Sequence, residues 1–370
     1  MKKKIVRLKS KNPKDTDSLF VGGEFYSDDE WISDQRTLTT EGLYFLNGGR
    51  ACLTVIAHFL QTQGIHDILL PAYLCPTILD VLEAAGLQYS FYRVHEDLTI
   101  DVRDLQRKAA GQQVVYFINY FGFPQPQPVQ QCLQALQQQG RLLVEDNAQA
   151  GFMEHTLGDL TFNSMRKLCP QDGGYLQTRF DLSSIIAQYA GRLNRRLPVI
   201  RAYRNKLRAY LLEGTGNFEE LEELFRLSEQ YYLNDEVIVG DEQERRQIEH
   251  MDWEGIRQKR RENYRFLLEH LSGIPNIQPI FPSLPPEVMP MGLPVYIQGG
   301  ARDRVYQELG NASIGLVIHW EELLHDPRTN GNSTVVDMAS RMLTLNCDQR
   351  TDSAQMIYMV NQLLQISGGK

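Results

Sequence analysis

Helical and strand-like patterns of apolar residues alternate along the first half of the chain. In residues 52–59 the apolar positions recur with helical spacing, and Gly64 is placed to end that helix. A short apolar run at 68–70 follows and stops at Pro71, as a buried strand would. The same rhythm continues to residue 178, with helices expected at 76–86, 101–111 and 129–140 and strands at 89–94, 114–119, 142–144, 161–165 and 174–177. This alternation predicts an α/β fold built on a parallel sheet.

The pattern changes after residue 180. Residues 180–241 are long charged stretches with helical spacing that have no place on the sheet, and we interpret them as a helical insertion or lid. Residues 242–271 predict one long, arginine-rich helix. Beyond it we expect strands at 277–281, 294–298 and 314–320 and helices at 302–309 and 353–366. We therefore predict two domains. Residues 1–240 form an N-terminal arm and a large domain that contains the insertion near 180–240. Residues 241–370 form a linking helix and a smaller α+β domain.

Composition narrows the class of protein. The chain has 370 residues, 42% hydrophobic and 23% charged, which is typical of a globular protein with a large core. A net charge of -8 argues against a general nucleic-acid binder, because phosphate contacts need a basic surface. Residues 1–14 are basic but no apolar run follows them, so we interpret them as an arm or first strand rather than a signal peptide. No apolar run approaches the roughly 18 residues of a membrane span.

Cysteine and histidine spacing gives no sign of a metal site. The five cysteines are scattered and include no CxxC pair, so neither a disulfide framework nor a zinc knuckle is expected, and a reducing cytoplasm fits best. The histidines that we considered as ligands lack a spacing such as HExxH, and we expect structural roles for His155, His319 and His325.

One carboxylate and one lysine carry the most specific chemical signal. Asp146 directly follows the apolar run 142–144, and in open α/β sheets ligands bind beyond the carboxyl ends of the strands. Lys167 lies between two expected strands, and the other lysine of the α/β half, Lys108, is on a polar helix face. Alone, Asp146 would be interpreted as a strand end and Lys167 as a surface residue. Together they suggest pyridoxal phosphate (PLP), because a lysine holds this cofactor as a Schiff base and an acid keeps its pyridinium nitrogen protonated.

A phosphate group would need backbone N–H groups at the start of a helix. The run Gly48-Gly49-Arg50-Ala51 opens the first amphipathic helix with flexible glycines and one positive charge, and Ser164 offers a hydroxyl. Each of these signals is weak alone, since a glycine pair is more often a turn and a serine in a strand is more often structural.

Other candidates follow the expected strand ends. Gln149 lies three residues after Asp146 and is positioned to hydrogen-bond the phenolic oxygen of the cofactor. Tyr73, Tyr120 and Phe121 follow strand ends where a ring can cover the pyridine face, although aromatic residues there are more often part of the core.

Taken in order, these motifs resemble the DegT/StrS-type aminotransferases, the nucleotide-sugar branch of the fold type I PLP enzymes in the aspartate aminotransferase superfamily. NGGRACL resembles the phosphate turn and helix of that family, and DILLPAYLCPTILDVLEAAG its next strand and helix. VEDNAQA and GDLTFNSMRK resemble its aspartate-glutamine and lysine motifs, with DGG for its usual Gly-Glu-Gly-Gly. GLVIHW and LTLNCDQRTDSAQMIYMV resemble its small-domain strand and closing helix.

The resemblance assigns roles to residues of this chain. Lys167 would be the Schiff-base lysine, Asp146 the pyridinium partner and Gln149 the phenolate contact. Cys75 stands where the family often has an aromatic residue over the ring. The implied cofactor site consists of Gly49, Arg50, Ala51, Tyr73, Cys75, Asp146, Gln149, Ser164 and Lys167.

The resemblance also implies a fold, an assembly and a reaction. The fold would be a three-layer αβα large domain with a mainly parallel seven-stranded sheet, followed by a small α+β C-terminal domain. The chain would form a cytoplasmic homodimer with the active site at the subunit interface. An amino group would pass from an amino acid, commonly glutamate, to a keto sugar, typically linked to a nucleotide. Polysaccharide biosynthesis is one setting for such a reaction.

Two alternatives stay open at this point. The scaffold can support another PLP reaction such as dehydration, although Lys167 disfavours the sugar dehydratases in which histidine replaces the lysine. The second alternative is a regulatory or scaffold protein that has lost catalysis and kept the fold. The residues around the site depart from the family pattern, and the Asn-Tyr-Arg segment that usually reaches the partner's site is absent.

Overall fold

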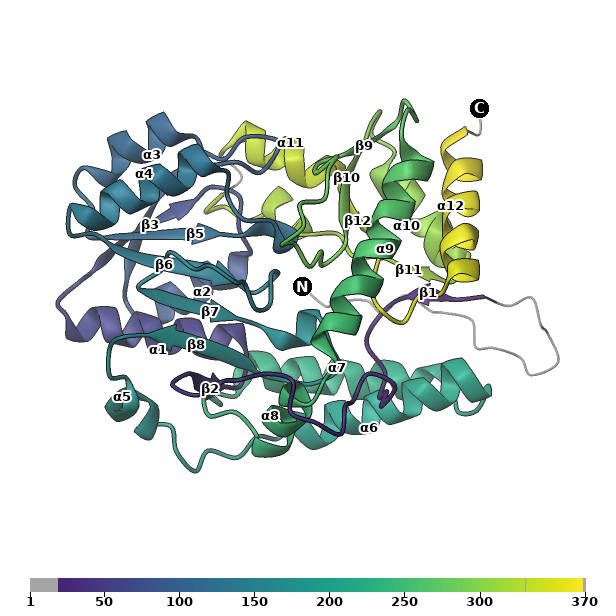
Figure 1. The fold of residues 1–370 in the computed structure, drawn as a ribbon, viewed down its shortest axis with the longest axis horizontal. Coiled ribbons are helices and arrows are strands. Elements are labelled where there is room, and N and C mark those ends of the chain that lie inside the picture. Colours follow the sequence, from purple (N-terminus) through teal and green to yellow (C-terminus); the bar gives the residue numbers. More distant parts are fainter. Residues whose placement is uncertain (1–18, 330, 369–370) are drawn as a thin grey trace.

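A twisted seven-stranded sheet forms the larger part of the computed structural model, which describes residues 19–329 and 331–368 (Figure 1). The basic segment 1–14 lies outside the described residues. In spatial order the strands are β2 (Tyr44–Leu46), β8 (Gly174–Thr178), β7 (Leu160–Asn163), β6 (Leu142–Asn147), β5 (Val114–Ile118), β3 (Asp67–Pro71) and β4 (Gln88–Tyr92). Strands β3 to β7 run parallel to one another, and β8 is antiparallel to both of its neighbours, β7 and β2. The predicted mainly parallel sheet is therefore confirmed.

Helices cover both faces of this sheet. The helices that connect its strands are α1 (Gly49–Thr62), α2 (Pro76–Ala84), α3 (Val102–Ala109) and α4 (Gln127–Gln138). Helix α1 packs on α2, and α3 packs on α4 on the opposite face (Figure 1). Every residue of β5 is buried, which explains why it appears in the sequence as a continuous apolar run.

A second, antiparallel sheet follows in the C-terminal part. Its order is β12 (Met342–Leu345), β10 (Leu293–Ile297), β9 (Ile277–Pro279). Helices α10 (Arg302–Asn311) and α11 (Ser333–Arg341) pack on it, and α12 (Ser353–Gly368) packs on α10. Together the two sheets confirm the predicted fold class of a large α/β unit and a smaller α+β unit. The domain boundary near residue 240 stays a prediction.

The strand predicted at 314–320 is wrong in its extent. Only Ile314–Gly315 (β11) forms a ladder, and its partner is Val21–Gly22 (β1) near the N-terminal end of the described chain. Val317 makes a single bridge to Thr344. Trp320 then adopts a left-handed conformation with φ of 58° and starts the 3-10 turn η4 (Glu321–Leu324), which ends the extended backbone.

The single helix predicted at 242–271 is also wrong, because the chain breaks into α8 (Glu242–Glu249) and α9 (Trp253–Leu271). At the break, Met251 forms a β-bridge with Ile32. Asp252 starts the second helix as its N-cap, and its carboxylate accepts the N–H of Gly255 at 3.0 Å. The contact with a distant segment therefore interrupts a pattern that is locally helical.

The insertion is helical, as predicted. It contains α5 (Ser183–Ala187), α6 (Arg196–Arg208), a π-helical turn η3 (Ala209–Glu213) and α7 (Phe218–Asn234). Helices α6 and α7 pack against each other below the smaller unit in Figure 1. They share an apolar core of their own, formed by Phe20, Tyr26, Leu197, Ile200, Tyr203, Leu207, Leu211, Phe218, Leu221 and Phe225.

The described residues contain neither a helix suited to span a membrane nor a cluster suited to bind a metal ion. No helix among them is long and apolar enough to cross a membrane. No group of three or more His, Cys, Asp or Glu side chains in that part of the chain is arranged to hold a metal ion.

Candidate functional site

Asp146 lies at the carboxyl end of β6 and is held by two hydrogen bonds. In the β5–β6 ladder Tyr116 is opposite Val144, two residues before Asp146, so both polar side chains emerge on the same face of the sheet. The Tyr116 hydroxyl donates to Oδ2 of Asp146 at 2.5 Å, and the Ala148 N–H donates to Oδ1 at 2.8 Å. The carboxylate is therefore fixed in orientation at the ligand-binding edge of the sheet.

The environment of Asp146 makes its charge costly. Burial raises the pKa of this carboxyl to about 6, while the Tyr116 hydroxyl, the Ala148 N–H and the positive charge of Lys167 act in the opposite direction. Burial likewise raises the pKa of Tyr116 far above its usual value, and the negative charge of Asp146 adds to this effect. Tyr116 therefore stays protonated and donates, and the structure brings Asp146, Lys167 and Cys75 into one neighbourhood.

The neighbouring carboxylate, Glu145, points to the other face and has a structural role. Its Oε2 accepts the N–H groups of Leu157 and Gly158 at 2.6 and 2.8 Å, and its Oε1 accepts the side-chain amides of Asn119 and Asn147. These bonds anchor the loop that connects β6 to β7. Of the two adjacent acids, only Asp146 is placed for ligand chemistry.

The glycine turn at 48–49 packs closely against Ser164 and β8, and its role in phosphate binding stays a prediction. Helix α1 begins at Gly49, after Gly48 with φ of 128°, and no side chain caps its start. A Cβ added to Gly49 would lie 3.2 Å from Cβ of Ser164, and one added to Gly174 would lie 2.9 Å from the carbonyl carbon of Gly48. The glycines of NGG and DGG thus let the helix start, the lysine turn and β8 approach closely, with the Ser164 side chain beside the uncapped helix.

Ala51 and Arg50, the other two residues predicted for this turn, lie in different surroundings. Ala51 is buried in the first turn of α1. The guanidinium of Arg50 turns toward α7, where Nη1 donates to the carbonyl oxygen of Leu233 at 3.4 Å and Cζ lies 5.5 Å from the ring centre of Tyr232. Its predicted contact with a phosphate stays a prediction.

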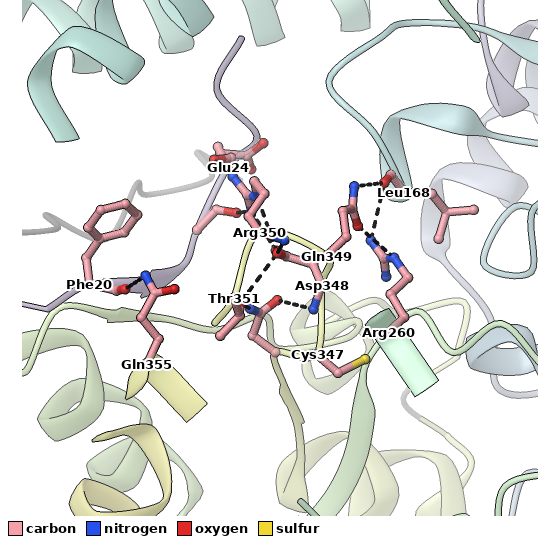
Figure 2. A network of polar contacts seen from close by, with 12 residues as sticks. Phe20, Glu24, Leu168, Arg260, Cys347, Asp348, Gln349, Arg350, Thr351 and Gln355 are labelled. Carbon is pink, nitrogen blue, oxygen red and sulfur yellow. Dashed lines mark hydrogen bonds and ion pairs between the residues drawn. The ribbon is translucent and has the colours of Figure 1, made fainter. Parts of the chain in front are cut away.

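Lys167 ends the 3-10 turn η2 (Met165–Lys167), and the carbonyl oxygen of the next residue is clamped by the C-terminal part of the chain. Figure 2 shows Arg260 of α9 and Gln349 converging on Leu168. Nη2 of Arg260 and Nε2 of Gln349 donate to the Leu168 carbonyl at 3.3 and 2.9 Å. Arg260 also donates to Gln349 and to the carbonyls of Pro290 and Met291, so its fully buried charge is well satisfied.

Gln149 is buried three residues beyond Asp146, and its side-chain oxygen is already engaged. Oε1 accepts the N–H of Phe121 at 2.9 Å. Phe121 has φ of 56°, a left-handed conformation that a bulky residue adopts only when its surroundings hold it there. Gln149 thus stabilises the tight connection after β5. Its contact with the phenolic oxygen of PLP stays a prediction, and the donor in that contact would be its side-chain amide nitrogen.

Tyr73 joins the two parts of the molecule. It is fully buried, and its hydroxyl donates to the carbonyl oxygen of His319 at 2.9 Å. Its ring packs against Trp320 and Tyr120 with centroids 5.1 and 6.2 Å apart. Cys75, the half-buried N-cap of α2, has its sulfur 3.0 Å from the hydroxyl of Thr77. Covering a cofactor ring stays a prediction for both Tyr73 and Cys75.

Lys167 opens onto a cavity of about 1300 Å³ between the large unit, the insertion and the smaller unit. Arg166 and residues of α6 and α7 line one side, and His319 with Thr344 lines the other. Nδ1 of His319 lies 2.8 Å from the Thr344 hydroxyl. The cavity is large enough for a small organic substrate.

Comparisons with known proteins establish the fold. No protein-family model and no curated protein sequence matches the chain. Among solved structures, Helicobacter pylori PseC, an aminotransferase involved in the biosynthesis of pseudoaminic acid, is 13% identical and has a TM-score of 0.63, covering 89% of this chain and 87% of its own. A DegT DnrJ EryC1 StrS aminotransferase from Brucella abortus is 16% identical with a TM-score of 0.58, covering 90% and 87%. The sugar aminotransferase CalS13 from Micromonospora echinospora is 16% identical with a TM-score of 0.57, covering 89% and 87%.

The chain has the fold of these aminotransferases. The fold implied by the motif resemblance is therefore confirmed, and the roles of the predicted site residues stay predictions. Tyr116, Arg260 and Gln349 were not predicted as site residues from the sequence, and His319 was predicted to have a structural role. A tyrosine two positions before the end of a buried strand was the one available signal for Tyr116.

Proposed function

We propose that the chain is a PLP-dependent aminotransferase that moves an amino group from an amino acid to a keto sugar. The observation that carries this proposal is the pairing of Asp146 and Lys167 at the carboxyl edge of the sheet, beside the uncapped start of α1. The shared fold with sugar aminotransferases supports the acceptor class. Glutamate is the first amino donor to test, and nucleotide-linked keto sugars are the first acceptors.

The residues present fit the cofactor. The uncapped N–H groups of α1 and the Ser164 hydroxyl would hold its phosphate, Asp146 its ring nitrogen and Lys167 its aldehyde carbon. When bound, PLP supplies an electron-withdrawing ring that makes the proton on the α carbon of the donor acidic. Nζ of Lys167 would take that proton, and a carboxylate at Asp146 would keep the ring nitrogen protonated.

We extend the proposal to a homodimer in the cytoplasm. The expectation of a dimer rests on the motif resemblance, and light scattering coupled to gel filtration would measure it. All five cysteines are free thiols, four of them buried, which agrees with a reducing compartment.

Trapping the cofactor tests the catalytic assignment. Borohydride treatment of the purified protein with PLP should fix the cofactor on Lys167, as located by peptide mass spectrometry. Lys167→Ala should lose both the visible absorption of the bound cofactor and the labelled peptide. Lys108→Ala is the matched control, because Lys108 is the other lysine of the α/β half and is held on α3 by Asp104 at 3.1 Å.

The outcome separates the proposal from its alternatives. If PLP does not attach to Lys167, the chain is better explained as a scaffold or regulatory protein that has kept the fold. If PLP attaches but no amino acid converts it to the amine form, transamination is wrong and another PLP reaction is favoured. A panel of keto nucleotide sugars then identifies the acceptor by product analysis.

A further inference from the structure

Two arginines line the cavity next to Lys167. Arg166 precedes Lys167 in the η2 turn, and Arg196 is the first residue of α6, brought to the same wall by the insertion. Arg196 is only 5% exposed, so its charge has been almost completely removed from water. A buried guanidinium is costly unless anionic groups or hydrogen bonds compensate it.

The two guanidinium groups gather around Tyr232 of α7. Their Cζ atoms lie 4.1 Å (Arg166) and 5.2 Å (Arg196) from the centre of its ring, and Arg50 approaches the same ring from α1 at 5.5 Å. Such contacts with an aromatic face are favourable but do not neutralise charge. Three positive groups therefore converge on one side chain, that of Tyr232.

The nearby carboxylates are shared among several guanidinium groups. Glu229 serves both cavity arginines, at 3.6 Å from Arg166 and 3.5 Å from Arg196. Asp172 pairs with Arg196 but also with Arg204, at 2.9 Å from the latter. Each of these two acids is thus shared between two guanidinium groups.

Unused hydrogen-bonding capacity points to a ligand. Nε of Arg196 is buried and has no hydrogen-bond partner among the described residues. Burial lowers the pKa of Arg196 to about 10. The positive charge of Arg166 also lowers this pKa, whereas the negative charge of Glu229 raises it. A buried N–H donor that is left unsatisfied costs about 1–3 kcal/mol. An anion bound in the cavity beside Arg196 would stabilise this buried positive charge.

We propose that Arg166 and Arg196 form an anion subsite on the wall of the Lys167 cavity that binds a carboxylate or phosphate group of a substrate. Planar guanidinium groups match both anions, since each presents paired N–H donors to two oxygens. The inference that the anion belongs to a substrate rests on the proposed function, whereas anion binding itself does not depend on it. A carboxylate would come from the amino donor, and a phosphate from a nucleotide-linked acceptor.

Calorimetric titration of the full-length protein tests the subsite. The probes are glutarate for the donor carboxylate, uridine diphosphate for the acceptor phosphates and uridine as a neutral control. At least one anion should bind the unmodified protein, and Arg166→Gln and Arg196→Gln should each weaken it 10- to 100-fold, as expected for a charge-assisted hydrogen bond. Any binding of uridine should not change. If these variants weaken the binding of glutarate, the amino donor is the source of the anion. If they weaken the binding of uridine diphosphate, the acceptor is its source.

Two further variants separate binding from folding. Arg208→Gln removes an equal charge from the exposed end of α6, where its ion pair with Glu213 spans 3.9 Å, and should leave the affinity for both anions unchanged. Arg196→Lys keeps the charge but lacks the paired donors, and should fall between the unmodified protein and Arg196→Gln. Melting temperatures of all variants show whether the network around α6 has survived.

The inference is wrong if neither anion binds the unmodified protein, if Arg166→Gln and Arg196→Lys bind both as tightly as it does, or if Arg208→Gln weakens binding equally. The network would then serve only to attach α6 to the lysine turn. The attachment of PLP to Lys167 is a separate measurement. Its failure would contradict the proposed function without affecting the anion titrations.

Discussion

Replacing Asp146 by asparagine should make the cofactor-free protein more stable at neutral pH. A rise in the pKa of this carboxyl from 3.8 to about 6 corresponds to about 3 kcal/mol, at about 1.4 kcal/mol per pKa unit. Between these values the folded chain binds more protons than the unfolded chain, so its free energy of unfolding falls as the pH rises. This contribution of Asp146 is fully present below pH 3.8 and is lost as the pH passes about 6. Asparagine does not ionise and can still accept the Ala148 N–H.

Urea denaturation of the cofactor-free proteins at several pH values measures the effect. The stability advantage of Asp146→Asn should increase by about 1.4 kcal/mol between pH 5 and pH 8, because most of the ionisation of Asp146 falls in this interval. The control is Asp34→Asn at an exposed position, which should leave the pH dependence unchanged. An advantage that is equal at both pH values would refute the reasoning that burial opposes the charge of Asp146. The same variant should lose most transaminase activity, since an amide does not hold a ring nitrogen protonated.

Two other substitutions test the neighbourhood of the site. Gly49→Ala would place a methyl group 3.2 Å from Cβ of Ser164, and we expect at least a tenfold loss of PLP affinity by equilibrium dialysis; unchanged affinity would contradict the phosphate assignment. Gln349→Leu removes a buried donor from the Leu168 carbonyl and an acceptor from Arg260. It should therefore cost about 1–3 kcal/mol in urea denaturation, and a cost near zero would mean that the clamp in Figure 2 is not needed for stability.

The main sheet could be predicted from the sequence because its signals are local, and the candidate residues Asp146 and Lys167 could be selected for the same reason. A parallel strand buried on both faces appears as a short apolar run, and this holds for β5 and the first half of β6. Asp146 follows such a run directly, and Lys167 stands out because lysine is scarce in the α/β half. The glycine pair at 48–49 could be recognised for the same reason, since it precedes a clear helical pattern.

Interactions between distant segments could not be predicted. The role of Tyr116 depends on the register of β5 against β6, which the sequence of neither strand specifies. Arg260 appears in the sequence as one more charged residue of a polar helix. Its burial depends on carbonyl groups at residues 168, 290 and 291, which become its partners only after folding. The break at 250–252 depends in the same way on a bridge to Ile32.

The position of Lys167 depends on three separate parts of the chain. From one side, Arg260 of α9 holds the carbonyl of Leu168, and from another, the insertion grips the same loop through the ion pair of Asp172 with Arg196. The glycine turn before α1 packs on the third side. In the proposed function Lys167 is the reactive amine, and such an amine must be held within a fraction of an ångström to be effective. The insertion and the smaller unit would then contribute to catalysis even where they touch no reacting atom. The insertion, which differs from the family's motif pattern, therefore contacts the loop that follows Lys167 directly.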